Sequence, residues 1–139
     1  HQTASYLSAG SGTKYFFWLF ESKSEPGKDP LVMWLSGGPG CSSQLALLAE
    51  NGPCTVSRNG SGTIVNTHSW HARANVMWVD QPAAVGFSTA RKFEATTGFG
   101  THDEAGVAES MYAFLQNFYA QLPQYRGNDF YVFGESYAG

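Results

Sequence analysis

Three short apolar runs stand out along the chain, and each predicts a buried strand. They lie in residues 31–35, 75–80 and 130–133. A run of this length without polar alternation is typical of a strand that is covered on both faces. The third run is also rich in aromatic residues, which favour strands. We therefore expect a sheet with apolar groups on both sides.

A hairpin is predicted before the first of these runs. Residues 14–20 combine Tyr, Phe and Trp in a pattern that favours a strand. Residues 4–9 can pair with this strand across the glycine-rich turn at residues 10–12. Residues 54–74 are rich in Gly, Asn and Ser instead. There we expect a loop with one short strand at residues 63–65.

Two segments carry the signals of a helix. Residues 43–50 contain strong helix formers, and the Asn-Gly-Pro sequence at 51–53 ends the helix. A second helix is predicted from a capping box formed by Thr101 and Glu104, and it stops at Pro123. Its apolar positions follow a 3.6-residue period: Val107, Met111, Phe114, Leu115, Phe118 and Leu122. The alternation of strands and helices predicts an α/β fold with helices on both faces of the sheet.

Composition limits the classes of function. With 42% apolar and 15% aromatic residues, the chain is expected to be globular, and its 139 residues are enough for one domain with a core. A net charge of −3 with eight Lys and Arg leaves no basic patch for nucleic acid or an anionic membrane. No apolar run approaches the roughly 18 residues of a spanning helix. The N-terminus lacks the segments of a signal peptide, so we expect any such peptide to have been removed.

The two cysteines leave three states open. Cys41 and Cys54 can bond to each other, bond to cysteines elsewhere in a longer protein, or stay free. Their spacing to His68 and His71 does not match a zinc site, so we expect no metal. Asn59 begins an Asn-Gly-Ser sequon, which predicts N-glycosylation if the protein is secretory.

The last six residues, Gly134-Glu135-Ser136-Tyr137-Ala138-Gly139, have the form of a nucleophile elbow after the third apolar run. A serine on such a turn has its hydroxyl pushed out of the sheet, and the next helix directs backbone N–H groups toward it. This pattern predicts Ser136 as a nucleophile. The form here is Gly-x-Ser-x-Ala, with Ala138 two residues after the serine, where the commoner pattern has glycine. A plain Gly/Ser turn after a core strand is therefore the alternative interpretation.

A second motif, residues 34–43, joins a buried strand to a helix and reads Trp-Leu-Ser-Gly-Gly-Pro-Gly-Cys-Ser-Ser. Glycines in such a loop let backbone N–H groups approach a ligand closely. In this type of hydrolase the oxyanion hole combines an N–H after the nucleophile with one from an early strand-to-helix loop. Those two donors would be Tyr137 and Gly38. A tight turn with Ser42 or Ser43 as the helix N-cap is a second interpretation, compatible with the first.

A third motif, residues 80–88, follows the second apolar run at the rim where α/β sheets bind ligands. We expect its Asp80 to be structural rather than a catalytic acid. All histidines of the chain precede Ser136, and we expect them on the surface or in loops rather than as the general base: His1, His68, His71 and His102.

In this order and spacing, the three motifs resemble the serine carboxypeptidase family, within the α/β hydrolases. The resemblance covers essentially the whole chain and implies that residues 1–139 are the N-terminal part, about a third, of a single α/β-hydrolase domain. It implies an incomplete α/β-hydrolase fold with a mixed, mostly parallel sheet and helices on both faces, in which the strand at 130–133 lies near the middle of the complete sheet. It also implies that the triad Asp and His follow residue 139 and that no cofactor is needed.

The same resemblance implies roles for further residues. Ser136 matches the nucleophile, and Gly38 and Tyr137 match the oxyanion donors. Members of this family hold the free carboxylate of the substrate with an asparagine and two glutamates, and Glu50 and Glu135 match the two glutamates. Ser36 occupies the asparagine position, which leaves one hydroxyl donor where the amide offers two. Without the resemblance, Glu50 is interpreted as a solvated residue at a helix end.

The expected function is a serine-type carboxypeptidase acting on peptides with a free C-terminus. A substrate carboxylate beside Glu50 and Glu135 requires shared protons, so binding is expected to be best in acid. That condition suits a lysosome, a vacuole or a secreted acidic fluid. Two alternatives stay open: an acyltransferase or other non-peptidase hydrolase on the same scaffold, favoured by Ser36, and a catalytically inactive binding homologue.

Overall fold

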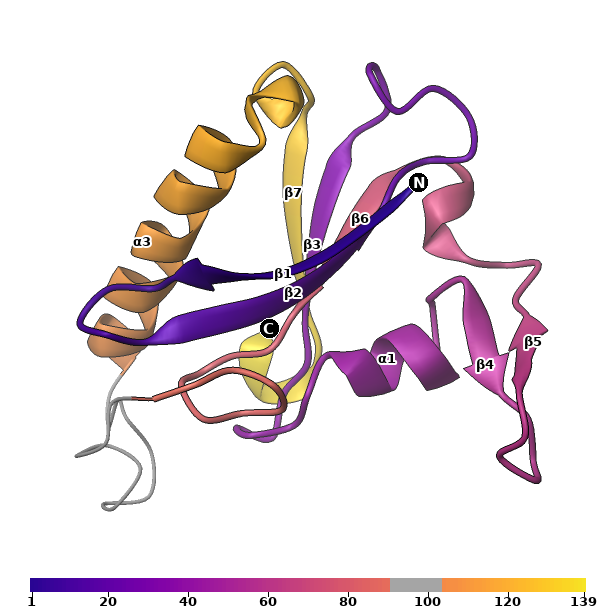
Figure 1. The fold of residues 1–139 in the computed structure, drawn as a ribbon, viewed down its shortest axis with the longest axis horizontal. Coiled ribbons are helices and arrows are strands. Elements are labelled where there is room, and N and C mark those ends of the chain that lie inside the picture. The colour runs from indigo at the N-terminus through magenta and orange to yellow at the C-terminus, as the bar shows by residue number, and fades with distance from the viewer. Residues whose placement is uncertain (91–103) are drawn as a thin grey trace.

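The computed structural model describes residues 1–90 and 104–139, and its centre is a five-stranded sheet (Figure 1). The strands lie in the order β1-β2-β6-β3-β7. Their bounds are β1 Gln2–Ser8, β2 Lys14–Phe20, β3 Leu31–Leu35, β6 Asn75–Val79 and β7 Phe130–Gly134. The hairpin and the three apolar runs of the sequence are thus confirmed as strands of a single sheet.

Pairing directions show that the sheet is mixed, as predicted. β1 pairs with β2 and β2 with β6 in antiparallel fashion, whereas β3 pairs with both β6 and β7 in parallel. The five-stranded sheet thus has two antiparallel and two parallel strand pairs, because β2 of the N-terminal hairpin pairs in antiparallel fashion with both of its neighbours. The carboxyl ends of β3, β6 and β7 therefore meet at one edge, where the three motifs follow them.

The helix α3 (Glu104–Gln121) covers one face of the sheet (Figure 1). Phe114 and Phe118 are fully buried, and both stack edge-on against Phe17 of β2, with ring centroids 5.9 and 5.6 Å apart. Edge-to-face packing of this kind adds to the stability from apolar burial. The predicted apolar face is thus confirmed from Glu104 onward, while the Thr101 half of the capping box lies outside the described residues.

The shorter helix α1 (Gln44–Ala49) covers the opposite face. Its Ala46 and Leu47 are buried against Val76 and Trp78 of β6. Neighbouring residues of β6, such as Met77, point to the α3 side instead, as the alternation along a strand requires. Helices on both faces are therefore confirmed.

The remaining elements are short. They are the strands β4 Cys54–Val56 and β5 Thr63–Val65 and the 3-10 helices η1 Trp70–Ala72, η2 Pro123–Tyr125 and η3 Ser136–Ala138. The prediction of a strand at β5 is confirmed. The prediction of a loop at residues 54–56 is wrong, because these residues form β4, which pairs with β5 in a separate two-stranded ribbon. None of the described helices is both long and apolar enough to cross a membrane.

The last strand, β7, is an edge strand of the sheet as described. Only β3 lies beside it, and Tyr131, Val132 and Phe133 are 51%, 51% and 44% exposed. Side chains on both faces of β7 are thus open to solvent, which sets it apart from the buried β3 and β6.

Candidate functional site

A sharp turn follows β7 and presents Ser136 to solvent. Ser136 has a φ of +56° and is exposed, a left-handed conformation that is uncommon for a residue with a side chain. The N–H of Ala138 donates to the Glu135 carbonyl at 3.0 Å, which closes the turn. A Cβ on Gly134 would lie 1.9 Å from the Ala138 carbonyl oxygen, so this position requires glycine. These features agree with the geometry expected of a nucleophile elbow.

The loop after β3 packs directly against this elbow. A Cβ built on Gly37 would lie 2.6 Å from the Glu135 carbonyl oxygen, 2.9 Å from the Ser136 Cβ and 2.9 Å from the Tyr137 nitrogen. Gly37 therefore sits where only a bare backbone fits. Sequence reasoning assigned no role to Gly37. The Gly37-Gly38 pair in the sequence was the available signal, and the sequence analysis assigned a role only to Gly38.

Two backbone N–H groups at this contact are available to a ligand. Gly38 follows Gly37 and has a φ of +116°, and Tyr137 follows Ser136. Within residues 1–90 and 104–139, neither N–H is hydrogen-bonded to an acceptor. Paired N–H groups beside a nucleophile can stabilise the oxyanion of an acyl-transfer reaction. The structure thus brings the predicted donors to the elbow.

Ser36 directly follows β3, and Glu135 directly follows the neighbouring strand β7. The Glu135 N–H donates to the carbonyl of Leu35 at 3.0 Å, which places Ser36 and Glu135 on adjoining strand ends. Ser36 is buried, and its Oγ accepts a hydrogen bond from the Trp34 indole N–H at 3.1 Å. Because the hydroxyl acts as acceptor in that bond, its own proton is left to donate to a ligand.

Glu50 follows α1 as its C-cap and is exposed. Partial burial raises the pKa of the Glu50 carboxyl above its usual range, and the negative charge of Glu135 raises it further. The two glutamates are therefore close enough to interact, although they are 85 residues apart in the sequence. The predicted carboxylate-binding residues lie on three different elements that meet at one edge of the sheet.

Among the described residues, Asp80 and the histidines form no hydrogen bond with Ser136. Asp80 is fully buried, and His71 is buried with its Nδ1 against the Ser69 hydroxyl. His68 is exposed, and His1 lies 3.6 Å from Glu21. In the part of the chain that the structure describes, no histidine is hydrogen-bonded to Ser136. His102 lies outside that part.

Cys41 lies in the glycine loop beside the elbow, where its N–H donates to the Gly37 carbonyl at 3.1 Å, whereas Cys54 and the sequon lie on the ribbon of β4 and β5. Cys41 is exposed and Cys54 is half-buried, and both are free thiols. Asn59 lies in the exposed turn between β4 and β5, where its Oδ1 accepts a hydrogen bond from the Ser61 hydroxyl at 2.8 Å. Among the described residues, no three His, Cys, Asp or Glu side chains are grouped to hold a metal.

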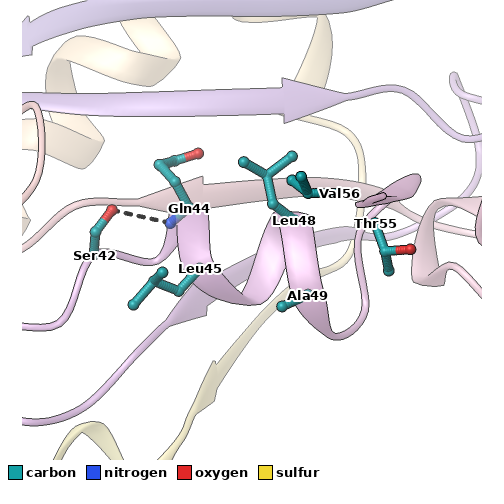
Figure 2. A pocket seen from close by; sticks show the side chains of 7 residues that line it. All are labelled: Ser42, Gln44, Leu45, Leu48, Ala49, Thr55 and Val56. Carbon is teal, nitrogen blue, oxygen red and sulfur yellow. Dashed lines mark hydrogen bonds between the residues drawn. The ribbon is translucent and has the colours of Figure 1, made fainter. Parts of the chain in front are cut away.

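Two pockets are lined in part by residues of the second motif or of the elbow turn. One, of about 500 Å³, lies along α1 and β4 (Figure 2), and its lining is mostly apolar: Ser42, Gln44, Leu45, Leu48, Ala49, Thr55 and Val56. The other, of about 340 Å³, separates Tyr137 and Gly139 from the side of α3 that carries Val107 and Met111. Tyr137, which carries one of the two predicted oxyanion N–H groups, therefore lines a pocket between the elbow turn and α3.

Comparison with known proteins gives consistent matches. A family model described as Serine carboxypeptidase matches residues 1–139. Carboxypeptidase S1 from Penicillium janthinellum is 42% identical over 142 positions, which cover 100% of this chain and 31% of the relative. A serine carboxypeptidase-like protein from Oryza sativa subsp. japonica is 47% identical over 127 residues, covering 91% of this chain and 28% of that protein.

A solved structure agrees with these sequence matches. The crystal structure of Kex1(Δ)p, a prohormone-processing carboxypeptidase from Saccharomyces cerevisiae, matches with a TM-score of 0.84 and 29% identity. The match covers 98% of this chain and 31% of that chain. The predicted α/β-hydrolase architecture is thereby confirmed. The chain spans less than a third of the length of these relatives.

Proposed function

The chain belongs to the serine carboxypeptidase family, and from this premise we propose that the protein carrying it is a serine-type carboxypeptidase. It releases C-terminal residues from peptides through an acyl-enzyme. The observation that carries this proposal is the contact between the Gly37 backbone and the Ser136 turn, with two unpaired N–H groups beside it. No cofactor takes part.

The proposed reaction follows from this arrangement. The Ser136 Oγ attacks the last peptide carbonyl, and a histidine from beyond residue 139, oriented by an aspartate from the same region, takes its proton. The N–H groups of Gly38 and Tyr137 stabilise the oxyanion. The C–N bond then breaks, the proton passes to the leaving amino group, and water hydrolyses the acyl ester to restore Ser136.

The two glutamates support the carboxylate end of the proposal. Because the pKa of Glu50 is raised, its carboxyl keeps a proton to a higher pH than an isolated glutamate does. A protonated Glu50 can donate a hydrogen bond to the substrate carboxylate. Binding is then strongest in acid, so we propose a lysosomal, vacuolar or secreted acidic location, with Asn59 as a glycosylation site.

Replacing Glu50 by Gln is expected to flatten the pH profile of the full-length enzyme. In the unsubstituted enzyme, kcat/KM on a blocked dipeptide should fall as pH rises through the raised pKa of Glu50, by roughly tenfold per pH unit once the proton is lost. Gln cannot lose a proton, so the fall should be shallower in Glu50→Gln. Kinetics between pH 4 and pH 8, in roughly one-unit steps spanning the acidic to neutral range, measure this.

Glu25→Gln is the matched control, because Glu25 is exposed and paired only with Lys28 at 2.9 Å in the turn before β3. Its profile should follow that of the unsubstituted enzyme. An unchanged slope in Glu50→Gln would contradict a role for Glu50 in proton sharing.

Peptides with a free C-terminus are expected to be cleaved far faster than the same peptides amidated. Replacing Ser36 by Asn, which adds a second donor, should lower KM for the free peptide. One hydrogen bond to a charged group contributes about 1.5–3 kcal/mol, so a change of roughly tenfold is expected. Equal turnover of free and amidated peptides in a side-by-side assay would rule out the exopeptidase proposal.

Ser36 also favours a second candidate, an acyltransferase or other non-peptidase hydrolase on the same scaffold. With one hydroxyl donor that also accepts from Trp34, Ser36 offers a weaker hold on a carboxylate than an amide would. Product analysis distinguishes the two: a transferase moves the acyl group from Ser136 to an added alcohol in preference to water.

A further inference from the structure

The carboxylate of Asp80 joins two loops beneath the candidate site. Its Oδ1 accepts hydrogen bonds from the Ser42 hydroxyl at 2.7 Å, the Ser43 N–H at 2.9 Å and the Gln44 amide at 3.3 Å. Its Oδ2 accepts the Phe87 N–H at 2.9 Å. Asp80 is fully buried at the end of β6. It therefore fixes the second motif to the third at a common point.

Hydrogen bonds through Ser43 connect both ends of the loop at residues 36–43 to Asp80. The Ser43 N–H donates to Asp80, and the Ser43 Oγ accepts the Ser36 N–H at 3.0 Å. Ser42 takes part as well, because its Oγ accepts the Gln44 N–H at 3.2 Å (Figure 2). The same hydroxyl donates to Asp80. Residues 36–43 are thus closed into a loop whose outer side carries Gly37 and Gly38 against the elbow.

The site of the Asp80 carboxylate is shaped for that group. A Cβ on Gly86 would lie 2.1 Å from the Asp80 Oδ2, so the third motif approaches the carboxylate by its bare backbone. Among the described residues, Asp80 has no cationic partner. Its charge is balanced by hydrogen-bond donors alone, and charge-assisted bonds of this kind are stronger than neutral ones.

We infer that Asp80 is a positioning residue that holds residues 36–43 against the Ser136 elbow and so sets the direction of the Gly38 N–H. The inference rests on the proposed function, since it assigns Asp80 to the same reaction. Asp80 acts through Ser43 and Gly37 and does not touch the reacting atoms. A misplacement of about 1 Å in such a group can slow a reaction about 100-fold.

Asp80→Asn in the full-length enzyme tests this. All groups on the two carboxylate oxygens are donors, so the amide must place an N–H against one of them. Titration with a fluorophosphonate counts the competent Ser136 sites, and kcat per titrated site then excludes unfolded protein. We expect kcat per site to fall about 10- to 100-fold. A kcat per site within about twofold of the unsubstituted enzyme would overturn the inference.

Asn75→Ala is the matched control for a merely structural effect. Asn75 is also fully buried, lies at the opposite end of β6, about 16 Å away, and bonds the carbonyls of Pro26 and Asp29. This variant should lose stability but keep its kcat per titrated site. An equal fall in both variants would assign Asp80 to general stability and overturn the inference.

Ser43→Ala provides a second test that does not depend on how Asp80→Asn folds. It removes the acceptor of the Ser36 N–H but keeps the Ser43 N–H bond to Asp80. We expect a fall in kcat per site of about threefold to tenfold, with faster amide hydrogen exchange at Ser36. Unchanged kcat and exchange would overturn the inference.

Amide exchange also separates the two proposals. If the unsubstituted protein neither reacts with fluorophosphonate at Ser136 nor hydrolyses peptides, the proposed function fails. Faster exchange at Ser36 and Ser43 in Asp80→Asn would then still support loop positioning by Asp80. Unchanged exchange at both amides would reject it.

Discussion

Replacing Ser136 by alanine is expected to abolish both fluorophosphonate labelling and peptide turnover in the full-length enzyme. Ser136 carries the aliphatic hydroxyl of the exposed elbow, and acylation of that oxygen forms the ester of the acyl-enzyme. Loss of the nucleophile in a serine hydrolase lowers kcat by about 10⁴-fold or more. Intact-mass measurement of the labelled protein and a peptide-release assay check both parts of this result.

Ser24→Ala is the control for that experiment, because Ser24 is exposed and lies in the turn before β3, at the opposite end of the sheet. It should label and turn over like the unsubstituted enzyme. Stoichiometric labelling that survives in Ser136→Ala would move the nucleophile to another residue. It would also remove the basis of the proposed function.

Replacing Gly37 by alanine should have the next largest effect. The added methyl would lie 2.6 Å from the Glu135 carbonyl oxygen and 2.9 Å from the Tyr137 nitrogen. Both are backbone atoms, so the loop and the elbow must separate. We expect kcat to fall about 100-fold or more, because oxyanion donors act only when correctly placed. Steady-state kinetics per titrated site measure the change.

Gly62→Ala is the matched control, since no atom lies within 4 Å of a Cβ at Gly62 and its turn is far from the elbow. That variant should retain full kcat. If Gly37→Ala also retained it, the close contact between the loop and the elbow would have no role in the reaction.

Much of the fold could be predicted because its strands are marked locally. β2 and β3 have the predicted bounds, since each is an apolar run ended by polar or turn residues. β4 was missed because Cys54 and Thr55 are only half-buried, Val56 is exposed, and the three residues carry no alternation. β4 exists through its pairing with β5, and a pairing partner is not visible in a local pattern.

For the candidate site too, residues in local motifs could be predicted, whereas contacts between distant segments could not. Ser136 and the glycine loop were predicted from short motifs, and the structure places Gly37 of that loop against the Ser136 turn. The closeness of Glu50 to Glu135 entered only through the resemblance. The contacts of Gly37 and Asp80 could not be predicted, because they join segments that are far apart in sequence and depend on distances of a few ångströms.

At Ser136 the left-handed backbone conformation lowers the stability of the folded state, while the side chain supplies the hydroxyl of the proposed reaction. A residue with a side chain in that conformation destabilises the folded state by about 1 kcal/mol or more, whereas glycine adopts it freely. Glycine at position 136 would therefore relieve the strain and remove the hydroxyl in one step. Selection for thermal stability alone would favour that exchange. A serine that persists in this conformation is the residue expected where selection acts on reactivity.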